Sequence, residues 1–113
     1  MPHAHAVVWL DHREAKVIQF NPEHSESQHV KHLGDDRLND YYHSVATKLT
    51  GVREILVLGP GNAKTEFVKH LKDHDPAVAN AVLGVESADH PSEGQILAKA
   101  REFFKAKDRM IAH

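Results

Sequence analysis

The sequence contains no cysteine, and that absence removes several classes of protein at once. Disulfide scaffolds, iron–sulfur clusters, thiolate zinc sites and cysteine nucleophiles all require this residue. No apolar run approaches the roughly 18 to 20 residues that span a bilayer. The first five residues, Met-Pro-His-Ala-His, lack the basic start and apolar centre of a signal peptide. We therefore expect a cytoplasmic protein with no membrane partner.

Basic residues are also in short supply. Lys and Arg number 14 against 16 Asp and Glu, so the formal net charge is −2 with neutral histidines. A strong nonspecific nucleic-acid binder usually carries a clear basic excess, which is missing here. The length of 113 residues, with 41% hydrophobic and 27% charged residues, is typical of one soluble globular domain. We expect a single domain over residues 1–113.

Histidine, in contrast, is abundant, with 11 residues in the chain. His70 and His74 are four residues apart on a predicted helix and would share a face at the spacing of zinc ligands. The other interpretation is that they are solvated histidines on a polar face. Two ligands need a third from elsewhere, so we assign no metal and no cofactor.

Hydrophobic patterning predicts the elements of the fold. Residues 6–10 and 55–58 are unbroken apolar runs, typical of strands buried on both faces. A polar turn over 11–14 joins the first run to a second strand over 15–20, and the polar segment 27–33 predicts a third strand at a sheet edge. A last strand is expected over 82–85.

Helices are expected between and after these strands. Apolar stripes at three- and four-residue spacing predict helices over 38–49, 63–71 and 96–104, and Asp75-Pro76 predicts a short helix through residue 79. The order βββαβαβα, with one extra short helix, indicates an α/β fold with a mixed five-stranded sheet and helices on both faces. That arrangement matches the ribonuclease H-like fold.

Two segments resemble a known family. Val-Val-Trp-Leu-Asp at 7–11, and Ile-Leu-Val-Leu-Gly-Pro-Gly-Asn-Ala-Lys-Thr-Glu-Phe at 55–67, are similar to the middle domain of archaeal and eukaryotic peptide-chain release factors and its bacterial relatives. Members of that family show a strand, Gly-Pro-Gly, and then a Lys and a Phe that open a helix. The resemblance covers nearly the whole chain. It implies a component of the translational machinery.

One departure from the family bears directly on activity. In release factors, a Gly-Gly-Gln loop between the third strand and the first helix promotes hydrolysis of peptidyl-tRNA. Here the junction over 31–37 is Lys-His-Leu-Gly-Asp-Asp-Arg, and Gln28 lies inside the predicted third strand. The resemblance therefore implies a noncatalytic binding domain that contacts the ribosome or an RNA-bearing partner. A homo-oligomeric regulatory or ligand-binding protein outside translation is the alternative.

The segment after the fourth strand is the candidate binding site for an anion, RNA or a partner. Amides at a helix N-terminus, with a lysine beside them, can hold a phosphate. The alternative is a tight turn that needs the backbone freedom of glycine. The segment is not a Walker A loop, because Gly-Lys-Ser/Thr is missing. The candidate residues are Gly59, Pro60, Gly61, Asn62 and Lys64.

Other sites are less well supported by the pattern. Asp11 stands where ribonuclease H-like nucleases place a metal-binding carboxylate, and Asp89 or Asp40 could join it, yet Asp11 more simply begins a hairpin turn. We expect no enzyme activity. The polar third strand is suited to pairing with a symmetry mate, which would give a homodimer. The aromatic residues are expected to pack in the core; they are Trp9, Tyr41, Phe67, Phe103 and Phe104.

Overall fold

Five strands form one mixed sheet in the spatial order β3-β2-β1-β4-β5. The computed structural model describes residues 4–34 and 37–111, and the side chains of those up to residue 107. The strands are β1 (His5–Leu10), β2 (Glu14–Phe20), β3 (Ser25–Lys31), β4 (Glu54–Gly59) and β5 (Val82–Ser87). The helices are α1 (Leu38–Thr47), α2 (Ala63–His74), α3 (Pro76–Ala81) and α4 (Glu93–Ile111).

The connections between strands follow the predicted order. Hairpins make β1, β2 and β3 successively antiparallel, whereas β4 is parallel to β1 and β5 is parallel to β4. Each parallel connection passes through helices, as parallel strands require. The predicted α/β fold with a mixed five-stranded sheet of the ribonuclease H-like kind is confirmed, including the short extra helix α3.

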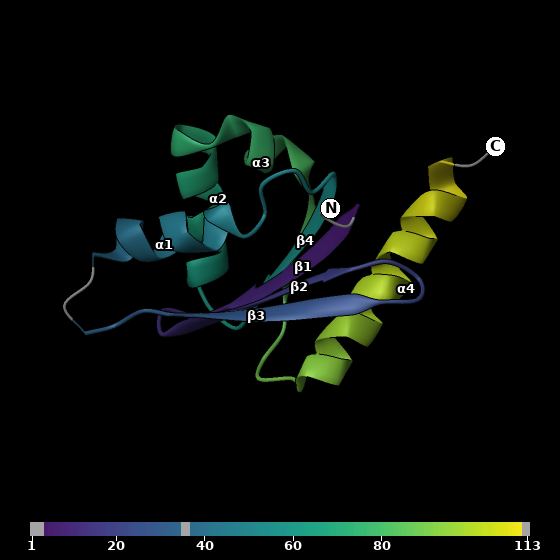
Figure 1. The fold of residues 1–113 in the computed structure, drawn as a ribbon, viewed down its shortest axis with the longest axis horizontal. Coiled ribbons are helices and arrows are strands. Elements are labelled where there is room, and N and C mark those ends of the chain that lie inside the picture. The colour runs from purple at the N-terminus through teal and green to yellow at the C-terminus, as the bar shows by residue number, and fades with distance from the viewer. Residues whose placement is uncertain (1–3, 35–36, 112–113) are drawn as a thin grey trace.

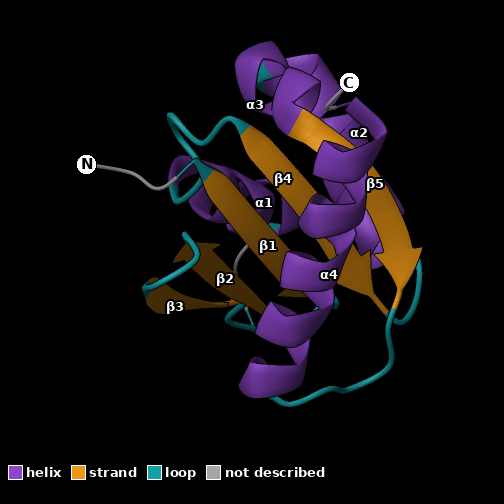
Figure 2. Ribbon diagram, turned by 90° about the vertical axis from the view of Figure 1, so that its right-hand side faces the viewer, coloured by secondary structure: helices purple, strands orange, loops and turns teal. Residues whose placement is uncertain are grey.

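Helices cover both faces of the sheet. Helices α1, α2 and α3 gather on one face, and α4 lies across the other (Figures 1 and 2). Alternate residues of β1 and β4 point to opposite faces, so both strands are buried on both sides. Ala6, Val8, Ile55 and Val57 belong to the core under the three helices. The core under α4 contains Val7, Trp9, Ile18, Phe20, Leu56, Leu58, Ile96, Ala100 and Phe104.

The aromatic residues occupy the core as expected, with one difference. Trp9, Tyr41, Phe67 and Phe104 are at most 3% exposed. Phe103 is only half-buried, because its ring covers the outer strand β5 at Gly84, where a β-carbon would come within 2.7 Å of the ring.

Local sequence signals also have structural counterparts. Gly51 follows α1 with a φ of 84°, a value that favours glycine over other residues. At the start of α4, the Ser92 amide donates to Gln95 Oε1 at 2.8 Å and the Gln95 amide donates to Ser92 Oγ at 3.2 Å. This reciprocal pair is a capping box, a pattern that the sequence Ser-x-x-Gln favours. Within the described part of the chain, no helix is both long and apolar enough to cross a membrane.

Candidate functional site

One edge of the sheet gathers the segments that follow four of the five strands. Because β1, β3, β4 and β5 run in the same direction, their carboxyl ends lie at this edge, which we call the carboxyl edge. Ligands of open α/β sheets bind at such edges. The loop after β1, the turn after β4 and the loop before α4 all meet here, so the candidate segment 59–64 is among them.

Gly59 ends β4, and the packing of the central strands explains why it is glycine. A β-carbon there would lie 2.3 Å from the carbonyl oxygen of Leu10, at the end of β1. The Gly59 carbonyl in turn accepts a hydrogen bond from the Ala88 amide at 3.0 Å. Gly59 is therefore fixed by a close approach of backbones.

Gly61 differs, because a β-carbon there would meet no atom within 4 Å. Its φ is also not positive; Gly51 is the one described residue with that conformation. The interpretation that this turn needs the backbone freedom of glycine is therefore wrong for both glycines. At Gly61 the structure gives no packing or conformational reason for glycine.

Helix α2 begins immediately after this turn. Asn62 is the N-cap residue, and its side chain makes no capping hydrogen bond. The Glu66 amide donates to the Asn62 carbonyl at 2.9 Å, which starts the helical pattern. The Lys64 ammonium donates to the Gly61 carbonyl, so its positive charge is held over the turn. Uncapped first-turn amides and a lysine therefore share this corner of the carboxyl edge.

A carboxylate one turn along α2 has its own partners. Glu66 Oε1 lies 3.1 Å from His12 Nε2 and accepts a hydrogen bond from the Tyr42 hydroxyl at 2.9 Å. The Tyr42 hydrogen bond, followed by His12, lowers the pKa of Glu66 below its usual range. Burial and the same hydrogen bond raise the pKa of Tyr42. No sequence pattern indicates this trio, because its members come from three separate segments.

Asp11 performs the turn role predicted for it. Its Oδ1 accepts hydrogen bonds from the amides of Arg13 at 2.8 Å and Glu14 at 2.9 Å. The other carboxylate oxygen lies 3.6 Å from His90 Nε2. Neither Asp89 nor Asp40 joins it in a metal site, since the described residues contain no group of three potential ligands.

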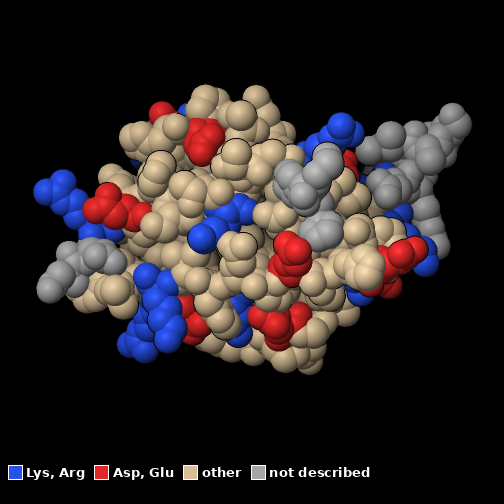
Figure 3. Space-filling view, in the orientation of Figure 1, with Lys and Arg blue, Asp and Glu red and all other residues tan. Residues whose placement is uncertain are grey.

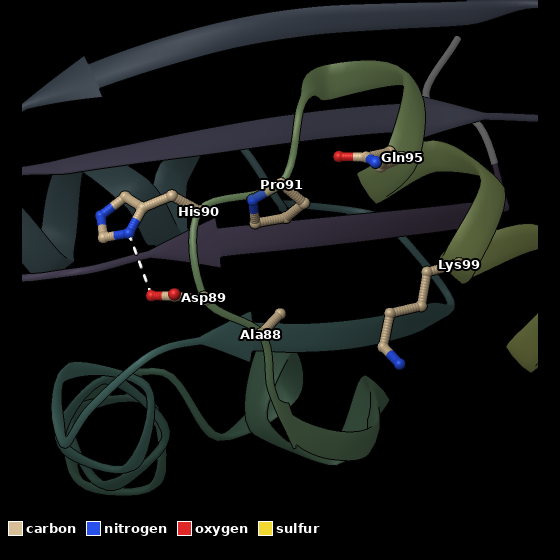
Figure 4. Close-up of a pocket in the computed structure, with 6 residues that line it drawn as sticks. All are labelled: Ala88, Asp89, His90, Pro91, Gln95 and Lys99. Carbon is tan, nitrogen blue, oxygen red and sulfur yellow. Dashed lines mark hydrogen bonds and ion pairs between the residues drawn. The ribbon is translucent and has the colours of Figure 1, made fainter.

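The loop before α4 forms one wall of an open pocket of about 460 Å³. In Figure 4, His90 turns toward Asp89, whose carboxylate lies 3.2 Å from its Nδ1. The Trp9 indole N–H anchors this loop from below by donating to the carbonyls of Ala88 at 3.1 Å and Asp89 at 2.8 Å. The pocket is lined by Ala88, Asp89, His90, Pro91, Gln95 and Lys99.

The histidine pair on α2 lies away from this edge, among the covering helices. The rings of His70 and His74 are 4.7 Å apart, so they do share a helix face. The interpretation of both as solvated histidines is wrong for His70, which is only 8% exposed. Among the residues that the structure describes, neither ring nitrogen of His70 has a hydrogen-bond partner. Burial, followed by the nearby His74 and His43, lowers the pKa of His70.

Comparison with known proteins gives no match at the level of sequence. No protein-family model matches the chain. No curated protein matches it either.

Solved structures, in contrast, share the fold. Pelota from Archaeoglobus fulgidus superposes with a TM-score of 0.70 and 18% identity, covering 87% of this chain and 30% of that one. The archaeal translation termination factor aRF1 gives 0.67 and 14%, covering 96% and 40%. Dom34 of S. cerevisiae, a translation termination-like factor, gives 0.60 and 11%, covering 96% and 37%.

The predicted resemblance to release-factor-like proteins is thus confirmed as a likeness of fold. The chain spans 30 to 40% of the length of these three structures. At identities of 11 to 18%, these likenesses show a shared fold and do not by themselves show a shared function.

Proposed function

We propose that this chain is a noncatalytic binding domain associated with translation, which contacts the ribosome or an RNA-bearing partner. The observation that supports the proposal is the fold shared over 96% of the chain with aRF1, described as a translation termination factor, and with Dom34, described as a translation termination-like factor. Dom34 is described as involved in RNA quality control pathways. We extend that setting to this chain.

The proposed lack of catalysis rests on the junction between β3 and α1. Release factors place Gly-Gly-Gln at this junction. In this chain, residues 31–37 contain a single glycine, Gly34, and no glutamine. Asp35 and Asp36 of this junction lie outside the described residues. We expect no release of peptide from peptidyl-tRNA on ribosomes, measured as released peptide against a buffer control. Stoichiometric release would contradict the noncatalytic role.

The proposed contact surface is the turn formed by Gly59, Pro60, Gly61, Asn62 and Lys64. It combines uncapped helix amides with the Lys64 ammonium, so helix dipole and side-chain charge favour an anion at the same place. Gly61 stands in open space, which lets a phosphate or an acidic side chain approach the backbone. Acidic and basic side chains are interspersed elsewhere on the face shown in Figure 3, without one continuous basic surface.

Charge reversal at Lys64 tests this surface. Lys64→Glu replaces an attractive contact with a repulsive one, and we expect cosedimentation with ribosomes to fall several-fold. Stability should change by less than about 0.5 kcal/mol, since the position is on the surface and an acidic residue suits a helix N-terminus. The matched control is Lys72→Glu, which makes the same charge change in the last turn of the same helix.

The two variants separate the possible outcomes. Loss of binding in Lys64→Glu alone supports the turn as the contact surface. Equal loss in both variants would mean that only the overall charge matters. A wild-type chain that stays at the top of the gradient with ribosomes present would contradict the proposal and favour a homo-oligomeric regulatory protein outside translation.

A further inference from the structure

The outer strand β5 has an unusual surface for the margin of a sheet. Three large apolar side chains are exposed in the described part of the chain, and two of them, Leu83 and Val85, belong to β5. They are 37% and 42% exposed. No described strand pairs with the outer side of β5, which lies at the opposite margin from β3 (Figure 2).

This margin also carries little charge. The ten residues over 76–85, which form α3 and most of β5, contain no Asp, Glu, Lys or Arg, although 27% of the chain is charged. Edge strands that must stay unpaired usually carry charges, especially lysine. Strand β3 follows that rule with Glu26 and Lys31, whereas the one charged residue of β5 is Glu86, whose carboxylate lies 3.1 Å from Lys99 Nζ of α4. An apolar margin with little charge is typical of the centre of a protein interface.

The backbone of β5 is also positioned for pairing. The Ala88 amide, just past the strand, points toward β4, where it donates to Gly59. Backbone groups alternate in direction along a strand. The amides and carbonyls of Val85 and Ser87 therefore point away from β4, within the plane of the sheet. These groups face outward at the free margin, next to the exposed apolar side chains.

We propose that β5 pairs antiparallel with β5 of a second copy of this chain, about a two-fold axis at Gly84. In that register, Leu83 of one copy lies opposite Val85 of the other, twice, so the exposed apolar side chains meet each other. Val82 lies opposite Glu86, and no like charges face each other. The same surface of a second copy therefore pairs the outward backbone groups of β5 and covers its exposed apolar side chains. Such self-complementarity is what a two-fold interface requires. The two sheets become one sheet of ten strands.

The oligomeric state of the purified chain tests this pairing. We expect sedimentation velocity to show a mass that rises toward twice the monomer mass with concentration. Val85→Lys places charge at the centre of the interface and should leave a monomer. Ser27→Lys places the same charge on the outer strand β3 and should leave the dimer intact. An unchanged far-ultraviolet circular dichroism spectrum and a cooperative thermal transition in both variants exclude misfolding as the cause.

Engineered cysteines test the register, because the chain has no thiol of its own. Under mild oxidation, a mixture of Leu83→Cys and Val85→Cys chains should form several-fold more crosslinked dimer than either variant alone. The proposal is overturned by a wild type that stays monomeric at all concentrations. It is also overturned by a dimer that Val85→Lys leaves intact, by one that Ser27→Lys disrupts, or by equal crosslinking in all three samples.

Discussion

The two helical layers that cover the sheet hold a histidine in different ways. Under the three helices, the buried His70 has no hydrogen-bond partner among the described residues for either ring nitrogen. On the face covered by α4, the partly exposed His5 has an acidic neighbour: its Nε2 lies at ion-pair distance, 2.8 Å, from a Glu54 carboxylate oxygen, although without hydrogen-bond geometry, and its ring packs against Phe20 and Phe104. A buried polar group without a partner is costly, and a charged one more so. The comparison predicts that protonation of His70 destabilises the three-helix layer.

The largest expected effect compares one buried aromatic residue from each layer. Phe67→Ala should lower the free energy of unfolding by about 3 to 5 kcal/mol, because a fully buried ring leaves a cavity. Phe104→Ala should cost less, since its contact with the partly exposed His5 places it where water can enter. Urea denaturation of the two variants measures both values. An equal or larger cost at Phe104 would show that the α4 layer contributes as much to stability.

A smaller loss of stability is expected from a substitution in β4, a central strand on which both helical layers pack. Gly59→Ala pushes a β-carbon against the Leu10 carbonyl and should cost about 1 to 3 kcal/mol, as overpacking does. Hydrogen exchange should then show weaker protection in α2 and α4 alike. Gly61→Ala, in the same turn, should stay within about 0.5 kcal/mol of the wild type. Similar costs for the two variants would contradict the distinction between these glycines.

The smallest effect is the pH response of the three-helix layer. The pKa of His70 is lowered in the folded chain, so the unfolded chain binds more protons below the ordinary value of about 6.5. The contribution of neutral His70 to the free energy of unfolding is therefore fully present above about pH 6.5. It is lost as the pH falls from that value through the lower pKa of the folded chain. His70→Phe should reduce the fall in the urea midpoint between pH 7 and pH 5. His74→Phe should reduce the fall by a smaller amount, because His74 lowers the pKa of His70 less than burial does. A fall that survives His70→Phe would mean that other groups cause it.

The elements of the fold were predictable because strong local signals agreed with one another. The apolar runs in β1 and β4, the polar β3 and the Ser92–Gln95 capping box each indicate one structure whatever surrounds them. The turn after β4 was recognisable for the same reason, since Gly-Pro-Gly between a strand and a helix is a local pattern.

The environment of individual residues was not predictable, because it depends on segments far apart in the chain. The need for glycine at position 59 comes from Leu10, and the burial of His70 comes from the packing of α1 on α2. His12, Tyr42 and Glu66 meet only after the hairpin and two helices are in place. The contrast between the two outer strands likewise required knowing which margin of the sheet each strand occupies.

The position of Trp9 allows binding to be measured by intrinsic tryptophan fluorescence. It is the only tryptophan in the chain, so emission excited at the red edge of absorption reports a single place. That place holds the loop before α4 by two indole hydrogen bonds, with the His90 ring 5.1 Å away and the Lys16 ammonium 5.6 Å above the indole. A partner that displaces this loop changes the polarity around the indole. Binding at the carboxyl edge can thus be followed in unlabelled protein by the colour and intensity of its fluorescence.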